Sequence, residues 1–256
     1  MGKVKIALLG DIHANLEAFT AVLDKIKELE VTHYVCIGDI VGYNANPKEC
    51  LDIMRGLNPI ATVRGNHDEY VGTDQDLFGF NPSAAAAVTW TRSQLNSEDR
   101  HYLATLPFSA VVRIPDIDMR PFKIVHGTLD NPKTWGYIFT RLQAVASMEN
   151  QRPYKLCFFG HTHMPIYFIE HDDDTQAFLF QENEPVIMEP NDRYLFNVGS
   201  IGQPRDGIQT AAFTLYTPEE SKVELFRVEY DIPTCQQKIR EAGLPERLAS
   251  RLEIGR

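Results

Sequence analysis

The chain has 256 residues, of which 43% are hydrophobic, so it is long enough to bury one large core. Its 35 acidic and 25 basic residues give a formal net charge of -10, and no basic cluster interrupts this balance. We therefore expect no broad nucleic-acid surface and no binding to an anionic membrane. No run of about 20 apolar residues is present, which argues against a membrane span.

The cysteines and the N-terminus indicate the compartment. The four cysteines are far apart and form no C-x-x-C pair. Cys36 and Cys157 fall within apolar patterns, where a thiol behaves as a small hydrophobic group. Residues 1–11 contain no long apolar stretch, so they predict a strand rather than a signal peptide. We expect a cytoplasmic protein.

The first predicted element is a strand over residues 6–9. This apolar run is short and ends abruptly in Gly10, Asp11 and, two residues later, His13. At the end of a strand, a spacing of two points both side chains the same way, so a carboxylate and an imidazole could reach one ion. One such pair is common by chance, and the downstream sequence has to support it.

Strands and helices then alternate. Residues 16–26 have a helical apolar period with Asn15 as its cap, and a second strand is predicted over residues 34–37. A helix over residues 47–55 and a third strand over residues 60–63 follow. This order predicts a doubly wound sheet with its functional groups outside the carboxyl ends of the strands.

The remaining chain divides into three parts. Residues 69–107 predict a helical insert beside the site, with helices over 83–95 and from 96 to 106. Most of the sequence from there to residue 228 predicts strands, and residues 234–256 predict a helical tail. We expect one domain over residues 1–256. The further strands are predicted at residues 111–113, 122–125, 155–159, 166–170, 177–181, 194–197, 211–216 and 223–228, with a helix over 141–150.

Metal-binding types of side chain follow five of these strands, each time beside a glycine that permits a tight turn and an open approach. Each pattern alone is common in proteins, but the ordered set is highly specific. The five patterns are Asp11-x-His13, Gly38-Asp39, Gly65-Asn66-His67-Asp68, His126-Gly127 and Gly160-His161-Thr162-His163.

This ordered set resembles the calcineurin-like metallophosphoesterase superfamily, over most of residues 4–228. The resemblance implies an α/β fold, a four-layer α/β/β/α sandwich of two mixed sheets. It implies two divalent ions roughly 3.5 Å apart, and hydrolysis of phosphoesters by a hydroxide that bridges them. Imidazole and carboxylate ligands fit manganese, iron, zinc or nickel, and we expect manganese.

The resemblance also implies a role for each matching residue. Asp39 would bridge the two ions, and His67 would face the substrate, stabilise charge on the phosphoryl group and protonate the departing oxygen. The ion ligands would be Asp11, His13, Asp39 and His163 for one ion, and Asp39, Asn66, His126 and His161 for the other. Asn66 would also contact the substrate.

Two departures from the pattern narrow the choice within the superfamily. Protein Ser/Thr phosphatases and symmetrical dinucleoside-tetraphosphatases carry an Asp or Asn and then an Arg where this chain has Gly42 and Tyr43. The chain looks more like the bacterial and archaeal phosphodiesterase branch, which shares the stretch 197–206. Arg205 could then contact phosphate, or pair with Asp206 instead. Tyr43 could line the substrate pocket or lie over the core.

We therefore expect a metal-dependent phosphodiesterase or phosphatase that acts on a small phosphorylated substrate, with diesters favoured over monoesters. Two alternatives stay open. One is a dinucleoside-polyphosphate or nucleotide pyrophosphatase; the other is a non-catalytic scaffold, as in the retromer subunit with this fold. Such scaffolds typically lose the histidine that corresponds to His67, and its presence here favours an enzyme. The sequence predicts no particular oligomeric state.

Overall fold

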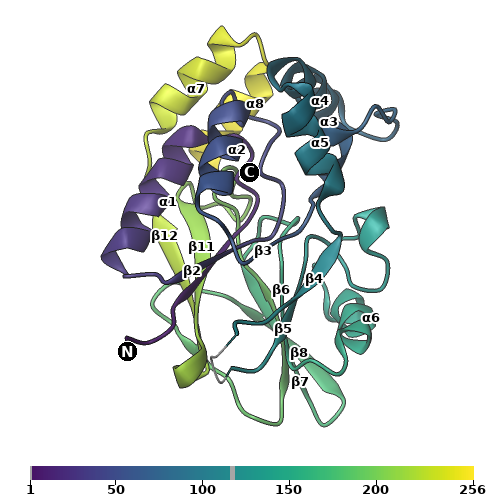
Figure 1. The fold of residues 1–256 in the computed structure, drawn as a ribbon, viewed down its shortest axis with the longest axis vertical. Helices are drawn as coiled ribbons and strands as arrows, with labels where there is room; N and C mark the ends of the chain where they lie inside the picture. Colours follow the sequence, from purple (N-terminus) through teal and green to yellow (C-terminus); the bar gives the residue numbers. More distant parts are fainter. Residues whose placement is uncertain (1, 116–118) are drawn as a thin grey trace.

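Two six-stranded mixed sheets lie face to face in the computed structural model, which describes residues 2–115 and 119–256 (Figure 1). The first sheet has the strand order β3-β2-β1-β11-β12-β9, and the second has the order β4-β5-β6-β10-β7-β8. The strands are β1 (Ile6–Leu9), β2 (His33–Cys36), β3 (Ala61–Thr62), β4 (Ser109–Val112), β5 (Phe122–Val125), β6 (Leu156–Phe159), β7 (Ile166–His171), β8 (Asp174–Leu179), β9 (Val186–Ile187), β10 (Arg193–Asn197), β11 (Ala211–Thr217) and β12 (Lys222–Val228).

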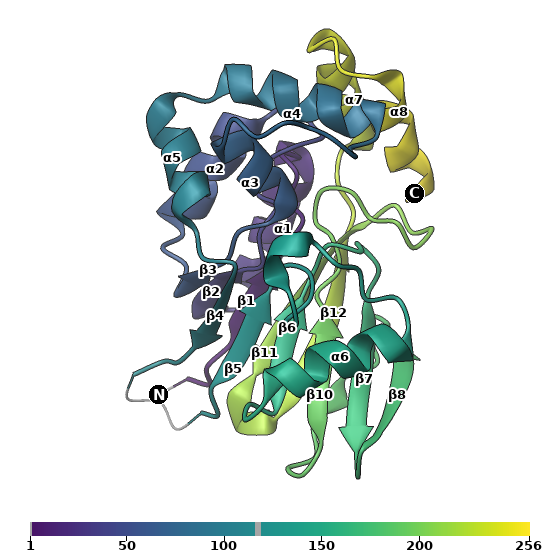
Figure 2. The same cartoon turned by 90° about the vertical axis from the view of Figure 1, so that its right-hand side faces the viewer.

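Helices cover the outer faces and one end of the two sheets (Figure 2). They are α1 (Leu16–Glu28), α2 (Pro47–Gly56), α3 (Asn66–Gly72), α4 (Pro82–Gln94), α5 (Ser97–Thr105), α6 (Arg141–Gln151), α7 (Ile232–Glu241) and α8 (Glu246–Ser250), with 3-10 turns at Pro132–Thr134, Pro218–Glu220 and Arg251–Ile254. Among the described residues, none of these helices combines the length and the apolar composition needed to cross a bilayer.

The alternation of side chains along β1 explains why its whole run is apolar. Ile6 and Leu8 point into a core shared with the second sheet, which contributes Phe122, Phe158 and other rings. Ala7 and Leu9 point the other way, into a separate core beneath α1 and α2. A strand buried on both faces needs apolar residues at every position.

The second sheet is covered in the same way. Its inner face joins the core between the sheets, and its outer face packs Cys157 and Phe159 against Ala144 and Met148 of α6. The four layers are therefore helix, sheet, sheet and helix, as expected. The expected doubly wound sheet is wrong, however, because the helices of the first sheet lie on one face only. The other face packs on the second sheet, whose strands come from the sequence beyond residue 107.

Connections determine which strands run parallel. β1, β2 and β3 are parallel because helices return the chain to the same edge, and Ile6 lies opposite His33. The short turn between β11 and β12 makes an antiparallel pair with Ala211 opposite Val228. In the second sheet, β5 and β6 are also parallel. The carboxyl ends of β1, β2, β5 and β6 thus meet at one end of the molecule.

Two elements differ from the sequence prediction. Residues 66–72 form α3, where a turn was expected, and Val186–Ile187 form the short strand β9. Asp68 explains the start of α3: its carboxylate accepts hydrogen bonds from the N–H groups of Gly65 and Ile40 at 3.1 and 2.9 Å. This side chain caps the helix and ties it to the loop after β2. Helices α4 and α5 form the expected insert.

The core between the sheets predicts the effect of one substitution. The ring of Phe158 is fully buried, with centroids 5.4 Å from Phe122 and 5.8 Å from Phe196. We expect Phe158→Ala to lower the free energy of unfolding by about 3–5 kcal/mol, because the side chain leaves a cavity. Urea denaturation measures this loss. The partly exposed Phe178 is the control, and an equal loss in Phe178→Ala would contradict the packing described.

Candidate metal centre

Loops from both sheets converge where the parallel strands end. Asp11 follows β1, Asp39 follows β2, His126 follows β5, and His161 and His163 follow β6. Hydrogen bonds between main chains hold the loops together: Asp11 N–H donates to Gly38 O at 3.0 Å, and Gly160 N–H donates to His126 O at 2.9 Å. Residues that are 150 positions apart, such as Asp11 and His161, therefore share one buried site.

The donor atoms form three overlapping groups: the first is Asp11, His13 and His163, the second is Asp39, His126 and His161, and the third is His13, Asp39 and His67. In the first, Asp11 Oδ1 lies 3.1 Å from His163 Nε2, and the Nε2 atoms of His13 and His163 are also 3.1 Å apart. In the second, Asp39 Oδ2 lies 3.2 Å from His126 Nε2, with a ring nitrogen of His161 close by. Asp39 Oδ2 also lies 3.5 Å from His13 Nε2, so this carboxylate stands between the groups.

Main-chain carbonyls orient all four histidines. Each ring has one nitrogen at hydrogen-bonding distance from a carbonyl, which assigns the proton to that nitrogen and leaves the lone pair of the other for a cation. Nδ1 of His13, His126 and His163 contacts the carbonyl of Val41, Ile37 and Gln203 at 3.2, 2.8 and 2.6 Å. His161 uses Nε2, which lies 2.9 Å from Trp135 O.

Several buried donor atoms make no hydrogen bond with the described residues, although Asp39 Oδ2 and His126 Nε2 lie within ion-pair distance of each other. The atoms without a hydrogen bond are Asp11 Oδ1, Asp39 Oδ2, Asn66 Oδ1 and His126 Nε2. Buried polar atoms are normally satisfied, so a set of unsatisfied oxygen and nitrogen atoms converging on one place fits a bound cation. Nitrogen and oxygen donors without thiolate suit first-row divalent ions. The residues present therefore fit a divalent cation.

For Asp39 and His126, neighbouring charges shift the pKa in the direction opposite to the effect of burial. Burial alone would raise the pKa of Asp39, but the charges of His126 and His67 hold it well below its usual range. Burial likewise lowers the pKa of His126, but Asp39 raises it to about 9. Without a cation, these two groups form a buried ion pair. For His161, burial together with the charge on His126 lowers the pKa to about 3, so this ring is neutral.

The backbone at the site is strained. Four site residues have positive φ angles, which residues other than glycine rarely adopt. They are Asp11 at 49°, Asp39 at 51°, His161 at 68° and His163 at 58°. Each such residue costs on the order of 1–3 kcal/mol, and such strain clusters at functional sites. Position 65 has no room for a side chain, because a Cβ on Gly65 would lie 2.0 Å from Asp39 Oδ1.

His67 belongs to the third group, in which one of its ring nitrogens lies within 4.8 Å of donor atoms of His13 and Asp39. It is the second residue of α3, its ring is buried, and its Nδ1 has no partner among the described residues. Its ring centroid is 4.2 Å from Tyr43 and 4.9 Å from His13. Gly42, at φ +95°, leaves room for it, since a Cβ there would lie 2.4 Å from His67 Nδ1. Burial lowers the pKa of His67 well below its ordinary value.

Arg205 also lies beside the site, although it is distant in sequence. Its Nη2 donates to Gln203 Oε1 at 2.9 Å and to the hydroxyl of Tyr43 at 3.3 Å. The pairing with Asp206 does not form, because Asp206 pairs with Arg227. Tyr43 lies between two parts of the molecule: its ring contacts His67, and it belongs to an apolar cluster with the C-terminal helices.

A cavity of about 260 Å³ opens onto this site and is rich in aromatic side chains. Asn66, His67 and His161 line it together with Tyr43, Tyr70, Phe78, Phe80, Trp135 and Tyr137. The sequence analysis missed Trp135 and Tyr137, which follow the His126-Gly127 pattern in a loop. The ring of Tyr137 stacks on His161 with centroids 4.1 Å apart. Only the clustering of aromatic residues near a predicted ligand could have indicated them.

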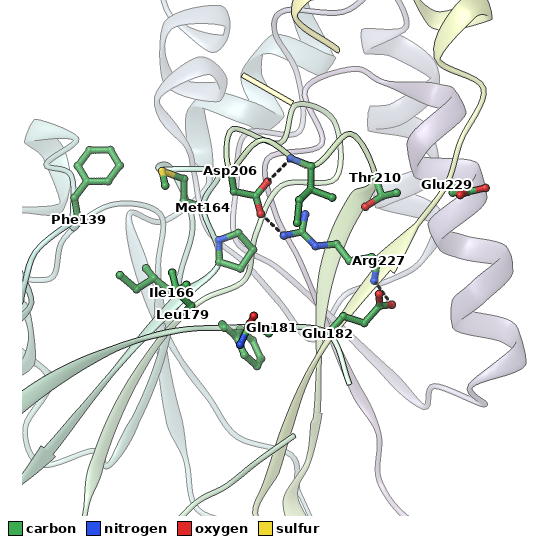
Figure 3. Close-up of a pocket in the computed structure, with 13 residues that line it drawn as sticks. Phe139, Met164, Ile166, Leu179, Gln181, Glu182, Asp206, Thr210, Arg227 and Glu229 are labelled. Atoms are coloured by element: carbon green, nitrogen blue, oxygen red, sulfur yellow. Dashed lines mark hydrogen bonds and ion pairs between the residues drawn. The ribbon is translucent and has the colours of Figure 1, made fainter. Parts of the chain in front are cut away.

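A larger cavity, of about 760 Å³, lies beside the β7–β8 hairpin and β12 (Figure 3). Figure 3 shows its apolar side chains, such as Met164 and Leu179, and the Asp206–Arg227 pair at its edge. None of the residues expected to bind metal lines it. Size alone is therefore a poor guide to the chemistry here, and the smaller cavity is the one next to the donor atoms.

The family follows from a comparison with known proteins. The family model of the calcineurin-like phosphoesterase superfamily domain matches residues 4–220, which is most of the chain. The chain belongs to this superfamily, and the sequence prediction of the family is confirmed.

Individual proteins are similar to this chain over all or nearly all of its length. Over 100% of both chains, the protein is 38% identical to uncharacterized protein MJ0912 of Methanocaldococcus jannaschii. It is 36% identical, again over 100% of both chains, to a metallophosphoesterase from Sphaerobacter thermophilus, whose crystal structure gives a TM-score of 0.87. Hypothetical protein PH1004 from Pyrococcus horikoshii OT3, at 24% identity over 99% of each chain and a TM-score of 0.80, shares the fold.

The buried Asp39–His126 pair predicts how metal affinity depends on pH. A divalent ion must displace the proton of His126, whose pKa is raised to about 9, so manganese affinity should fall as the pH drops below that value. Calorimetry near pH 8 in two buffers of different ionisation enthalpy should show release of roughly one proton. His126→Asn should release fewer protons, and unchanged release would contradict this assignment.

Proposed function

We propose that this protein is a dinuclear metal-dependent phosphoesterase that acts in the cytoplasm on small phosphorylated compounds, with phosphodiesters preferred over phosphomonoesters. The observation that carries this proposal is the group of buried donor atoms without partners, which lies next to a cavity in a member of the superfamily. Such a cluster is costly to bury unless it binds cations.

The proposal assigns seven residues to the two ions, preferably manganese. Asp39 bridges them, because its carboxylate lies between the two groups of histidines. The others are Asp11, His13 and His163 for one ion, and Asn66, His126 and His161 for the other. When bound, the ions supply Lewis acidity: they polarise phosphoryl oxygens and bring the pKa of water toward neutrality.

Electrostatics supports an anionic substrate despite the acidic surface. Two divalent ions and two aspartates leave a local charge of about +2 before the bridging hydroxide is counted, so the site attracts phosphate. The overall net charge of -10 acts over longer distances and is screened by salt. The sign of the local charge therefore decides which ligands bind.

His67 is the catalytic acid in this proposal. Its ring is neutral in the free protein because burial lowers its pKa. A phosphoryl group in the adjacent cavity would bring negative charge to the imidazole and raise its pKa. The protonated ring can then stabilise the charge on the phosphoryl group and protonate the departing oxygen. Tyr43 packs on the ring and limits its rotation.

Three residues would position the substrate. Asn66 lines the cavity, and Arg205, which bonds to Tyr43 of the same lining, would contact a phosphate group of the substrate. Tyr43 holds the guanidinium of Arg205 through its hydroxyl. Arg205 thus stands in for the arginine that other branches carry near Tyr43.

The direct test is hydrolysis of bis-p-nitrophenyl phosphate after manganese is added to the purified protein. The proposal expects turnover that depends on the metal and stops when a chelator is added. A metal-loaded protein that does not turn over this diester or p-nitrophenyl phosphate, and that binds a protein partner tightly, would be a scaffold instead.

The bridging position of Asp39 leads to a specific expectation. Asp39→Asn keeps the size of the side chain but removes the charge that both ions need, so bound manganese and turnover should both be lost. Elemental analysis and the diester assay measure the two effects. Asp24→Asn, on the exposed face of α1, is the matched control. Full activity of Asp39→Asn with two ions bound would rule out a bridge.

His67→Ala should separate metal binding from catalysis. Because His67 serves the substrate rather than the ions, the variant should keep its manganese and lose roughly 10²–10⁴ in kcat. The exposed His101, on α5, provides the matched control His101→Ala. Loss of metal in His67→Ala, with no reduction in turnover per bound ion pair, would mean that His67 is a ligand.

A further inference from the structure

The cavity of about 760 Å³ beside the β7–β8 hairpin has no part in the function proposed above (Figure 3). Its volume lies within the range of about 300–1,000 Å³ that is usual for sites that bind small molecules. Large apolar side chains line much of it and remain partly exposed, and Leu179, at 72%, is the most exposed of them. The others are Phe139, Met164 and Ile208. Exposed apolar side chains are normally scattered, so a group of them around one cavity marks a site of interaction.

Contacts among the lining residues and their neighbours hold the walls in place. Asp206 forms an ion pair with Arg227 of β12, and the N–H of Arg227 donates to Glu182 Oε1 at 3.1 Å. These contacts tie the β10–β11 loop and the segment after β8 to the same strand. Phe139 stacks on Tyr137, with ring centroids 5.4 Å apart. Because the walls are already ordered, a ligand would lose little free energy to ordering them.

The charge of the lining is negative. Three carboxylates and one guanidinium line the cavity, which gives a net charge of -2. The guanidinium of Arg227 is neutralised by Asp206, so the surplus lies on Glu182 and Glu229. Within residues 2–115 and 119–256, neither of these two side chains forms an ion pair. Figure 3 shows both of them on the opposite side of the cavity from Phe139 and Met164, so the cavity has an apolar side and an acidic side.

These charges and distances disfavour three kinds of occupant. An anion would meet a surplus of carboxylates. A metal ion needs several donors close together, and within the described ranges no group of donor atoms that could bind an ion includes a residue of this lining. A second copy of the chain carries a net charge of -10, so it would bring further negative charge toward the acidic side.

We propose that this cavity binds a small organic cation with an apolar body, such as an arylalkylamine. The apolar body would pack on Phe139, Met164 and Leu179, where burial removes exposed apolar surface from water. The protonated amine would lie toward Glu182 and Glu229, whose carboxylates can accept charge-assisted hydrogen bonds. The site is separate from the metal centre and does not depend on the phosphoesterase proposal.

Three probes with the same apolar body test the charge preference. 4-Phenylbutylamine, 4-phenylbutanol and 4-phenylbutyrate share the phenylbutyl group and are cationic, neutral and anionic at neutral pH. Each is titrated into the full chain by calorimetry. The amine should bind with a dissociation constant below about 1 mM, and at least about tenfold more tightly than the carboxylate. The alcohol should bind with intermediate affinity, because it keeps the apolar contacts alone.

Two cavity variants locate the binding. Leu179→Ser removes the most exposed apolar side chain and should weaken binding of all three probes by roughly threefold to tenfold. The double variant Glu182→Gln with Glu229→Gln removes the surplus charge, so it should abolish most of the preference for the amine over the alcohol. The matched controls Leu142→Ser and Glu149→Gln change exposed residues of α6 outside the lining, and both should bind the probes like the unmodified protein.

Contrary results would overturn the proposal in distinct ways. If the amine does not bind, or binds no better than the carboxylate, the cavity does not select a cation. Binding that neither cavity variant changes would place the probe elsewhere, for example in the aromatic cavity beside His67. Sedimentation of the full chain is the last measurement: a dimer that Leu179→Ser converts to a monomer would make the cavity an interface between copies. Hydrolysis of the diester, or its absence, affects none of these outcomes.

Discussion

The structure depends on burying two carboxylates and four imidazoles in one small volume. Asp11 and Asp39 are both fully buried, and their carboxylates are compensated by the histidines that surround them. Such a group is tolerated only where opposite charge and hydrogen bonds replace the lost water. The partnerless oxygen atoms indicate that protein groups alone do not complete this compensation. The folded state and the affinity for cations are therefore two consequences of the same arrangement.

The α/β/β/α architecture makes this burial feasible by separating packing from chemistry. Below the site, alternating apolar residues of β1 fill two cores, so the strand is held from both sides. The packed strand holds Asp11, which follows it, in a conformation with positive φ that would be too strained for an unsupported loop. Main-chain carbonyls then fix the ring nitrogens of the histidines. The oriented donors are thus a product of the sheets, because loops without that support would adopt many conformations.

The sequence predicted the elements that a local pattern defines and missed those that tertiary contacts define. The apolar run at residues 6–9 and the Asn15 cap have a local cause, and both are present as predicted. The doubly wound sheet was wrong because Leu8 and Val35 look alike whether they pack on helices or on a second sheet. The prediction of a turn at Asn66 and His67 missed the start of α3, where Asp68 accepts a local bond from Gly65 N–H and a second bond from Ile40 N–H, 28 positions away, that no local pattern shows. The aromatic wall formed by Trp135 and Tyr137 has no periodic signal at all.

The hydrogen bond between His161 and the carbonyl of Trp135 has a consequence for how the protein responds to its ligands. Trp135 lines the cavity, while its main-chain oxygen sets the direction of a histidine that faces the donor cluster. Any molecule that shifts this loop must also turn the imidazole, and any ion that fixes the imidazole must steady the loop. By thermodynamic reciprocity, occupancy of the cavity and retention of the ion then help or hinder each other by the same factor. Ligand binding in the cavity lined by Trp135 and ion binding at His161 are therefore energetically coupled.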